Sequence, residues 1–140
     1  MHLDEKNTVI PDVMIVCDKS IIKSDGIYGA PDLIVEVLSP STASRDRKEK
    51  RALYEKCGIK EYWIVSPGEK SIEVHLLQDG SLQLDNAYAL YPDWQWAKMT
   101  DEEKNAAVLS FRVSLYDDFT VDLRDIKRFF VNSCGGKFFK

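Results

Sequence analysis

The chain has 140 residues and a formal net charge of −4, and 44% of its residues are hydrophobic, 30% charged and 11% aromatic. These values predict a soluble globular protein with one domain and a substantial core. The acidic net charge disfavours a general nucleic-acid binder, although a local basic patch can still bind nucleic acid.

Two further features bear on location. No stretch approaches the roughly 18 apolar residues of a membrane span, and the first five residues do not resemble a signal peptide. The three cysteines, Cys17, Cys57 and Cys134, are widely spaced, odd in number and without metal-ligand spacing. We therefore expect reduced thiols in a cytoplasmic protein that does not enter a membrane.

The first half of the chain predicts two strands and a helix. Residues 9–16 and 32–38 are apolar runs that favour strands, and a loop with two glycines separates them. The segment "SPSTAS" then supplies N-cap hydroxyls for a helix over residues 44–57. Gly58 is predicted to end this helix, because its C′ position favours a left-handed residue.

The second half predicts mainly strands. Thr100 and Glu103 form a capping-box pattern for a short helix, and residues 122–130 are also predicted to be helical. Turns are expected at Pro67–Gly68 and at residues 79–80. The strands expected here are 61–65, 71–77, 82–90 and 111–116. The order of elements predicts an α/β or α+β fold with a β-sheet flanked by helices.

Glu36 lies in the middle of the predicted strand 32–38, between apolar neighbours. Burying a carboxylate without a partner costs several kcal/mol, and proteins avoid it unless the charge is paired or binds a metal. Either Glu36 reaches the exposed face of the sheet, or the fold requires a carboxylate at this position.

Asp12 offers a reason for such a requirement. If strands 9–16 and 32–38 pair in antiparallel fashion, Asp12 lies next to Glu36, with Cβ atoms about 5 Å apart. Asp32 would lie roughly 13 Å away, too far to share an ion. Two close carboxylates raise the pKa of one of them unless a cation lies between them. A hard divalent ion such as Mg²⁺ meets that need.

The predicted helix adds a cation. Lys50, Leu53, Tyr54 and Cys57 recur at helical spacing on one face, which extends back to Asp46. Lys50 either points inward or lies along the edge of the core with its ammonium in water, paired with Asp46. Pointing inward, it completes the equipment for metal-assisted phosphodiester hydrolysis.

The runs "PDVMIVCD", "GAPDLIVEVLSPST" and "RDRKEKRALYEKCGIKEYWIVSP" resemble the Uma-two family of bacterial candidate restriction endonucleases with the PD-(D/E)xK fold. The resemblance implies a mixed, restriction-endonuclease-like sheet, a Mg²⁺ or Mn²⁺ cofactor and DNA as the substrate. Asp12 then matches the first acid of the family site and Glu36 the second. Leu38 stands where the lysine is usual, and the resemblance implies that Lys50 takes its place. Asp32 also matches a family motif.

The resemblance leaves Asp32 and Asp46 as accessory candidates. Residues 43–60 also carry seven basic and three acidic side chains, a local net charge of +4. Such a run is usually a solvated helix face, but next to the site it could hold a phosphate backbone. The candidate nucleic-acid-binding residues in it are Arg45, Arg47, Lys48 and Arg51.

Members of the family usually have a longer segment before the first matched strand. We therefore expect an exposed sheet edge and a homodimer, formed through residues 9–16 or 111–116. A single nuclease-like domain is predicted over residues 1–130, followed by a flexible tail over 131–140. The leading interpretation is a metal-dependent endodeoxyribonuclease. The alternative is an inactive nuclease-fold protein that binds nucleic acid, or that serves as a dimeric interaction module.

Overall fold

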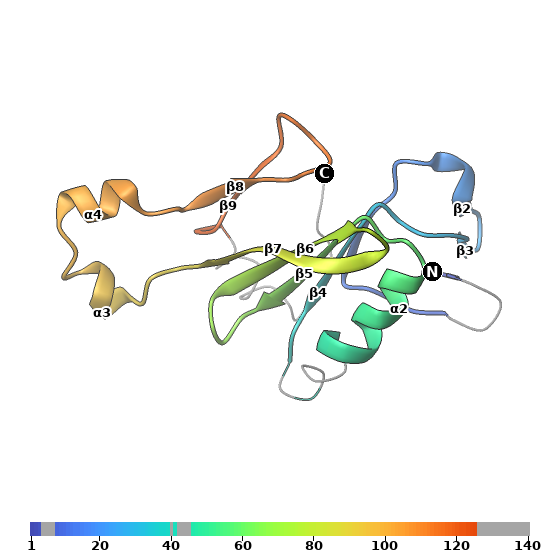
Figure 1. The fold of residues 1–140 in the computed structure, drawn as a ribbon, viewed down its shortest axis with the longest axis horizontal. Coiled ribbons are helices and arrows are strands. Elements are labelled where there is room, and N and C mark those ends of the chain that lie inside the picture. Colours follow the sequence, from blue (N-terminus) through green and yellow to red (C-terminus); the bar gives the residue numbers. More distant parts are fainter. Residues whose placement is uncertain (4–7, 40, 42–45, 126–140) are drawn as a thin grey trace. The chain divides into compact units, whose positions relative to one another are not determined.

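The computed structural model describes residues 1–3, 8–39, 41 and 46–125 (Figure 1). They form two compact units, the first made of residues 1–67 and 72–87 and the second of the remaining described residues. The single domain over residues 1–130 stays a prediction, and the predicted tail over 131–140 lies outside the described residues.

A five-stranded mixed sheet, in the order β1-β4-β5-β6-β7, forms the framework of the first unit. β1 pairs with β4 in antiparallel fashion and β4 with β5 in parallel fashion. The predicted α/β (α+β) fold with a mixed sheet is therefore confirmed. The strand bounds are β1 (Val13–Ile15), β4 (Leu33–Val37), β5 (Glu61–Ser66), β6 (Ser71–Gln78) and β7 (Ser81–Ala89).

The first strand is shorter than the predicted run 9–16. Pro11 lacks a backbone N–H and so cannot donate to a ladder, and pairing starts only after it. Ile10, just before the proline, is 87% exposed. The loop that follows contains a 3₁₀ turn, η1 (Lys19–Ile21), and a small hairpin of β2 (Ile22–Lys23) and β3 (Gly26–Ile27).

Because β4 and β5 are parallel, a crossover must join them, and it is helical (Figure 1). It consists of a π-helical segment, η2 (Asp46–Lys50), that continues into α2 (Arg51–Lys56). Gly58 has a φ of +76°, which is the left-handed position expected at the helix end. Residues 44 and 45 of the predicted helix lie outside the described part of the chain.

The helix covers one face of the sheet. The buried cluster beneath it consists of Ile34, Tyr54, Ile59, Tyr62, Ile64 and Leu82. Its members come from β4, α2, β5, β7 and, for Ile59, the connection between α2 and β5, so this face is the core of the first unit. Asp79 and Gly80 have φ values of 51° and 79° and form the predicted tight turn between β6 and β7.

The second unit contains α3 (Asp93–Trp96), α4 (Asp101–Ala106) and a hairpin of β8 (Ser110–Arg112) with β9 (Thr120–Asp122). The predicted capping box of Thr100 and Glu103 is present. The predicted strand 111–116 stops at Arg112. The helix predicted from residue 122 is wrong at its start, since Asp122 belongs to β9 and accepts the backbone N–H of Arg124 in a turn. Residues 126–130 lie outside the described residues.

Candidate active site

Asp12 and Glu36 are brought together by the pairing of β1 with β4. The register sets Val13 opposite Val35, and continued by one position it sets Asp12 opposite Glu36. The Asp12 carboxylate also accepts a hydrogen bond from the backbone N–H of Val37, with 2.7 Å between Oδ2 and N. The antiparallel pairing predicted from the sequence is thus confirmed, and Asp12 is held directly before β1.

Glu36 is buried, with 2% of its surface exposed. Within the parallel register it lies opposite Ile64, a member of the cluster beneath α2. The first alternative for this residue, a place on the exposed face of the sheet, is therefore excluded. An acid at this position needs partners, and the helix that follows provides two of them.

Lys50 and Tyr54, one helical turn apart, contact different oxygens of the Glu36 carboxylate. Lys50 Nζ lies 2.9 Å from Oε2, and the Tyr54 hydroxyl donates to Oε1 at 2.6 Å. Tyr54 is fully buried, whereas the Lys50 side chain is 20% exposed. Of the two alternatives for Lys50, the structure has the inward one, at the junction of η2 and α2.

Sequence reasoning assigned Tyr54 to the packed face but missed its contact with Glu36. A signal was available, because a buried tyrosine needs a hydrogen-bond partner for its hydroxyl. Glu36 was the buried acid in need of a donor. A phenylalanine would have served packing alone at this position.

Burial is the main cause that raises the pKa of Glu36 above its ordinary value. The hydrogen bonds from Tyr54 and Lys50 and the charge of Lys50 act in the opposite direction, and the charge of Asp12 raises this pKa further. The sequence argument expected crowding to raise the pKa of one of the two acids, Glu36 or Asp12. The direction agrees, but removal from water contributes more than the neighbouring acid.

The carboxylate oxygens of Asp12 and Glu36 are suitable ligands for a hard divalent cation. Carboxylate oxygens are the protein ligands that Mg²⁺ and Mn²⁺ prefer, and each carboxylate offers about four lone-pair sites. Glu36 can therefore accept its two hydrogen bonds and still ligate an ion. Among the described residues no group of three or more His, Cys, Asp and Glu side chains is arranged around a metal position. Asp12 and Glu36 would thus share the ion with waters or substrate oxygens.

Asp32 is engaged at the other end of β4. Its carboxylate accepts the backbone N–H of Cys17 at 2.8 Å and the Lys60 ammonium at 2.7 Å. The Lys60 hydrogen bond is the main cause that lowers the pKa of Asp32. The structure therefore separates Asp32 from the Asp12–Glu36 pair, as the strand spacing predicted, and gives it a role in joining loop, strand and turn. Asp46 begins η2, but its side chain is outside the described part.

Two of the predicted nucleic-acid-binding residues have partners within the chain. Arg47 forms an ion pair of 2.5 Å with Glu73 of β6, and Arg51 donates to the backbone carbonyl of Leu82. Lys48 is exposed on the same segment. Arg45 lies outside the described residues. The structure thus leaves contact of this segment with nucleic acid as a prediction.

His75 lies beneath the helix beside the Arg47–Glu73 pair and is 4% exposed. Its Nε2 is 3.4 Å from a Glu73 carboxylate oxygen, while within the described part of the chain its Nδ1 has no hydrogen-bond partner. Burial lowers the pKa of His75, and the charges of Arg51 and Arg47 lower it further. The hydrogen bond with Glu73 and the charge of Glu73 act in the opposite direction. A neutral imidazole is therefore favoured here.

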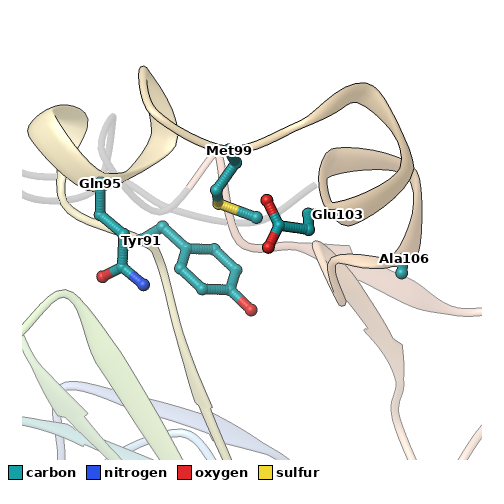
Figure 2. Close-up of a pocket in the computed structure, with 5 residues that line it drawn as sticks. All are labelled: Tyr91, Gln95, Met99, Glu103 and Ala106. Atoms are coloured by element: carbon teal, nitrogen blue, oxygen red, sulfur yellow. The ribbon is translucent and has the colours of Figure 1, made fainter.

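A separate open hollow of about 350 Å³ lies within the second unit (Figure 2). It contains none of the predicted site residues, and its one acid, Glu103, is already engaged by the capping box. The lining residues are Tyr91, Gln95, Met99, Glu103 and Ala106. This hollow has no pair of carboxylates like that of Asp12 and Glu36.

None of the helices in the described segments is long and apolar enough to span a bilayer.

The chain is similar in sequence to one curated protein and in fold to one solved structure. An uncharacterized protein of Synechocystis sp. is 36% identical over 89 residues, which is 62% of this chain and 47% of that protein. A crystal structure from Anabaena variabilis, described as "a putative nuclease belonging to DUF820", matches with a TM-score of 0.55 and 19% identity over 84% of this chain and 59% of that one. The chain thus spans about half the length of the curated relative.

The structural match shows that the two chains share a fold, and the match to a family model shows the family. The family model Uma2, described as "Putative restriction endonuclease", matches residues 1–101. Restriction-endonuclease-like families generally use divalent metal ions. The chain belongs to the Uma2 family.

Proposed function

We propose that this protein is a metal-dependent endonuclease that hydrolyses phosphodiester bonds in DNA. The observation that supports the proposal best is the buried Glu36 carboxylate, which is set opposite Asp12 and paired with Lys50. Proteins rarely bury an acid next to another acid, and such a placement is typical of functional sites. Membership of the Uma2 family supports the same activity.

In this proposal Asp12 and Glu36 hold a divalent cation, Mg²⁺ or Mn²⁺. When bound, such an ion polarises a phosphate oxygen and lowers the pKa of a coordinated water. Glu36 is fixed by its strand and by Tyr54, and Asp12 is held by the backbone N–H of Val37. Both ligands are therefore oriented before any ion arrives, which reduces the cost of binding.

Lys50 supplies the cation near the reacting phosphate. Its side chain is partly exposed, so its ammonium can exchange Glu36 for a phosphate oxygen or for the attacking water. There it would position that water or stabilise the negative charge that develops in the transition state. Lys48, with Arg45, Arg47 and Arg51, would provide electrostatic attraction for the DNA backbone.

We also propose a homodimer. Among the described strands β1 pairs only with β4 and lies at one end of the sheet order. An edge strand presents unpaired N–H and C=O groups that can pair with a second chain. Closed two-fold symmetry is the commonest arrangement, and residues 9–16 or 111–116 would form the contact. Light scattering at micromolar concentration tests this, and a monomer mass would contradict it.

The test of activity is the nicking of supercoiled plasmid with Mg²⁺ or Mn²⁺, compared with EDTA. Glu36→Gln should remove the cleavage. Glu61→Gln is a matched control, because Glu61 is a buried glutamate of the neighbouring strand that accepts a hydrogen bond from Trp63 instead. Equal activity of the two variants would contradict the site.

Absence of cleavage with either ion would favour the alternative of an inactive nuclease-fold protein. A gel-shift assay at two salt concentrations would then decide between nucleic-acid binding and an interaction module, because backbone binding weakens steeply with salt.

A further inference from the structure

Glu36 has two helical partners of different character. Tyr54 is fully buried and donates to Oε1, whereas Lys50 is partly exposed and contacts Oε2. The two donors come from one face of one helix, four residues apart, so that each carboxylate oxygen has its own partner. This division differs from a simple buried ion pair, in which removal of the lysine would leave the acid without support.

The two partners also differ in mobility. A tyrosine has two side-chain torsions, and the Tyr54 ring is packed edge-on against Tyr62, with ring centroids 5.2 Å apart. A lysine has a flexible four-carbon stem and a strongly hydrated ammonium group. Lys50 can therefore leave Glu36 toward solvent, while the Tyr54 hydroxyl is carried by a buried ring that packs against Tyr62.

We propose that Tyr54 is a positioning residue of the nuclease site, which holds Oε1 of Glu36 in place so that Lys50 can release Oε2 to an incoming metal ion. The inference rests on the proposed function in one respect, namely that Glu36 is a metal ligand. Outer partners of ligating carboxylates orient the ligand and contribute to metal affinity. Tyr54 acts through Glu36 and does not touch the substrate.

This division of roles predicts opposite effects of the two partners on metal binding. Lys50 and the ion compete for one carboxylate oxygen, so Lys50→Met should bind Mn²⁺ more tightly than the wild type. Loss of the tyrosine hydroxyl leaves Glu36 less well oriented, so Tyr54→Phe should bind Mn²⁺ about 10–100-fold more weakly. A purely structural role of Tyr54 would change stability and leave the Mn²⁺ affinity alone.

The experiment is a Mn²⁺ titration of the full chain without DNA, with free Mn²⁺ counted by electron paramagnetic resonance. Tyr62→Phe is the control, because Tyr62 is an equally buried tyrosine of the same cluster. We expect weaker binding for Tyr54→Phe, wild-type binding for Tyr62→Phe and tighter binding for Lys50→Met. Urea unfolding of each variant confirms that it is folded under the conditions used.

The outcomes separate the inference from the proposed function. If Glu36→Gln loses the Mn²⁺ site while Tyr54→Phe binds like Tyr62→Phe, the role of Tyr54 is wrong and the metal site stands. If Glu36→Gln binds Mn²⁺ like the wild type, the metal site itself is wrong and the inference falls with it. Weaker binding by Lys50→Met would also overturn the inference, since it would show that Lys50 supports the ligand geometry.

Discussion

Glu36 and Lys50 form an ion pair of 2.9 Å between a buried strand and the helix that follows it. The acid is almost fully buried and the lysine only partly so, and the carboxylate has a second partner in Tyr54. The pair therefore holds the helix to the sheet at the position where chemistry is proposed. The effects of this pair on stability and on activity can be measured separately, since only the lysine reaches solvent.

We predict that Lys50→Met lowers the free energy of unfolding by up to about 3 kcal/mol at neutral pH, because it leaves a buried carboxylate without its cation. Adding Glu36→Gln to this variant should recover part of the loss, since the buried group is then neutral. Urea unfolding of the two single variants and the double variant measures the coupling. Lys56→Met, at an exposed position of the same helix, should stay within about 0.5 kcal/mol of the wild type.

Asp12 is predicted to have a structural contribution that can be distinguished from its proposed role as a ligand. Asp12→Ala removes the acceptor of the Val37 N–H and should destabilise the fold by about 1 kcal/mol. Asp12→Asn keeps an amide oxygen in the same place and should cost less. Both variants should lose metal-dependent cleavage. Equal stability of the two variants in urea would show that the hydrogen bond to Val37 contributes nothing.

The sequence predicts that Asp12, Glu36 and Lys50 come together, because these arguments are local or depend on strand periodicity. An antiparallel pair with apolar alternation fixes which residues lie opposite one another, and this set Asp12 beside Glu36. Helical spacing placed Lys50 on the packed face next to Tyr54. The hydrogen bond from the Tyr54 hydroxyl to Glu36 does not follow from these arguments, because packing alone already explains a buried aromatic residue.

Long-range partners were beyond such arguments. The sequence predicts that Arg47 and Arg51 belong to a solvated basic face or to a contact with a phosphate backbone. Their partners, Glu73 and Leu82, are 26 and 31 residues further along the chain. Local spacing does not predict contacts of this kind, which depend on the position of β6 and β7 beneath the helix. The apolar run predicts a longer β1 than the structure has, because Pro11 has no N–H to donate to the ladder.

We predict that the contribution of Asp32 to stability is lost in acid. The pKa of Asp32 is lowered in the folded state, mainly by Lys60, so its contribution is present at neutral pH and is lost as the pH falls through that lowered pKa. Asp32→Asn should therefore be less stable than the wild type at pH 7, and the difference should shrink below about pH 4. Thermal unfolding from pH 7 to pH 3 measures it. A constant difference over this range would contradict the ion pair with Lys60.

We predict that His75 makes the stability of the fold depend on pH in a higher pH range than Asp32 does. Its pKa is lowered in the folded state, so the unfolded chain binds the proton first and stability declines as the pH falls below about 6.5. The decline continues until the folded-state pKa is reached. His75→Gln should remove this part of the dependence. A variant with the same slope as the wild type between pH 7 and pH 5 would show that His75 is not the group responsible.

The most direct test of the proposed site is the anomalous diffraction of a crystal soaked in Mn²⁺. We predict an anomalous peak within coordination distance of the Asp12 and Glu36 carboxylates, with Lys50 Nζ moved away from Oε2 and Tyr54 still bonded to Oε1. The same soak of Glu36→Gln should show no peak at this position. A wild-type crystal with Mn²⁺ bound only elsewhere, from a preparation that cleaves DNA, would contradict the assignment of the site.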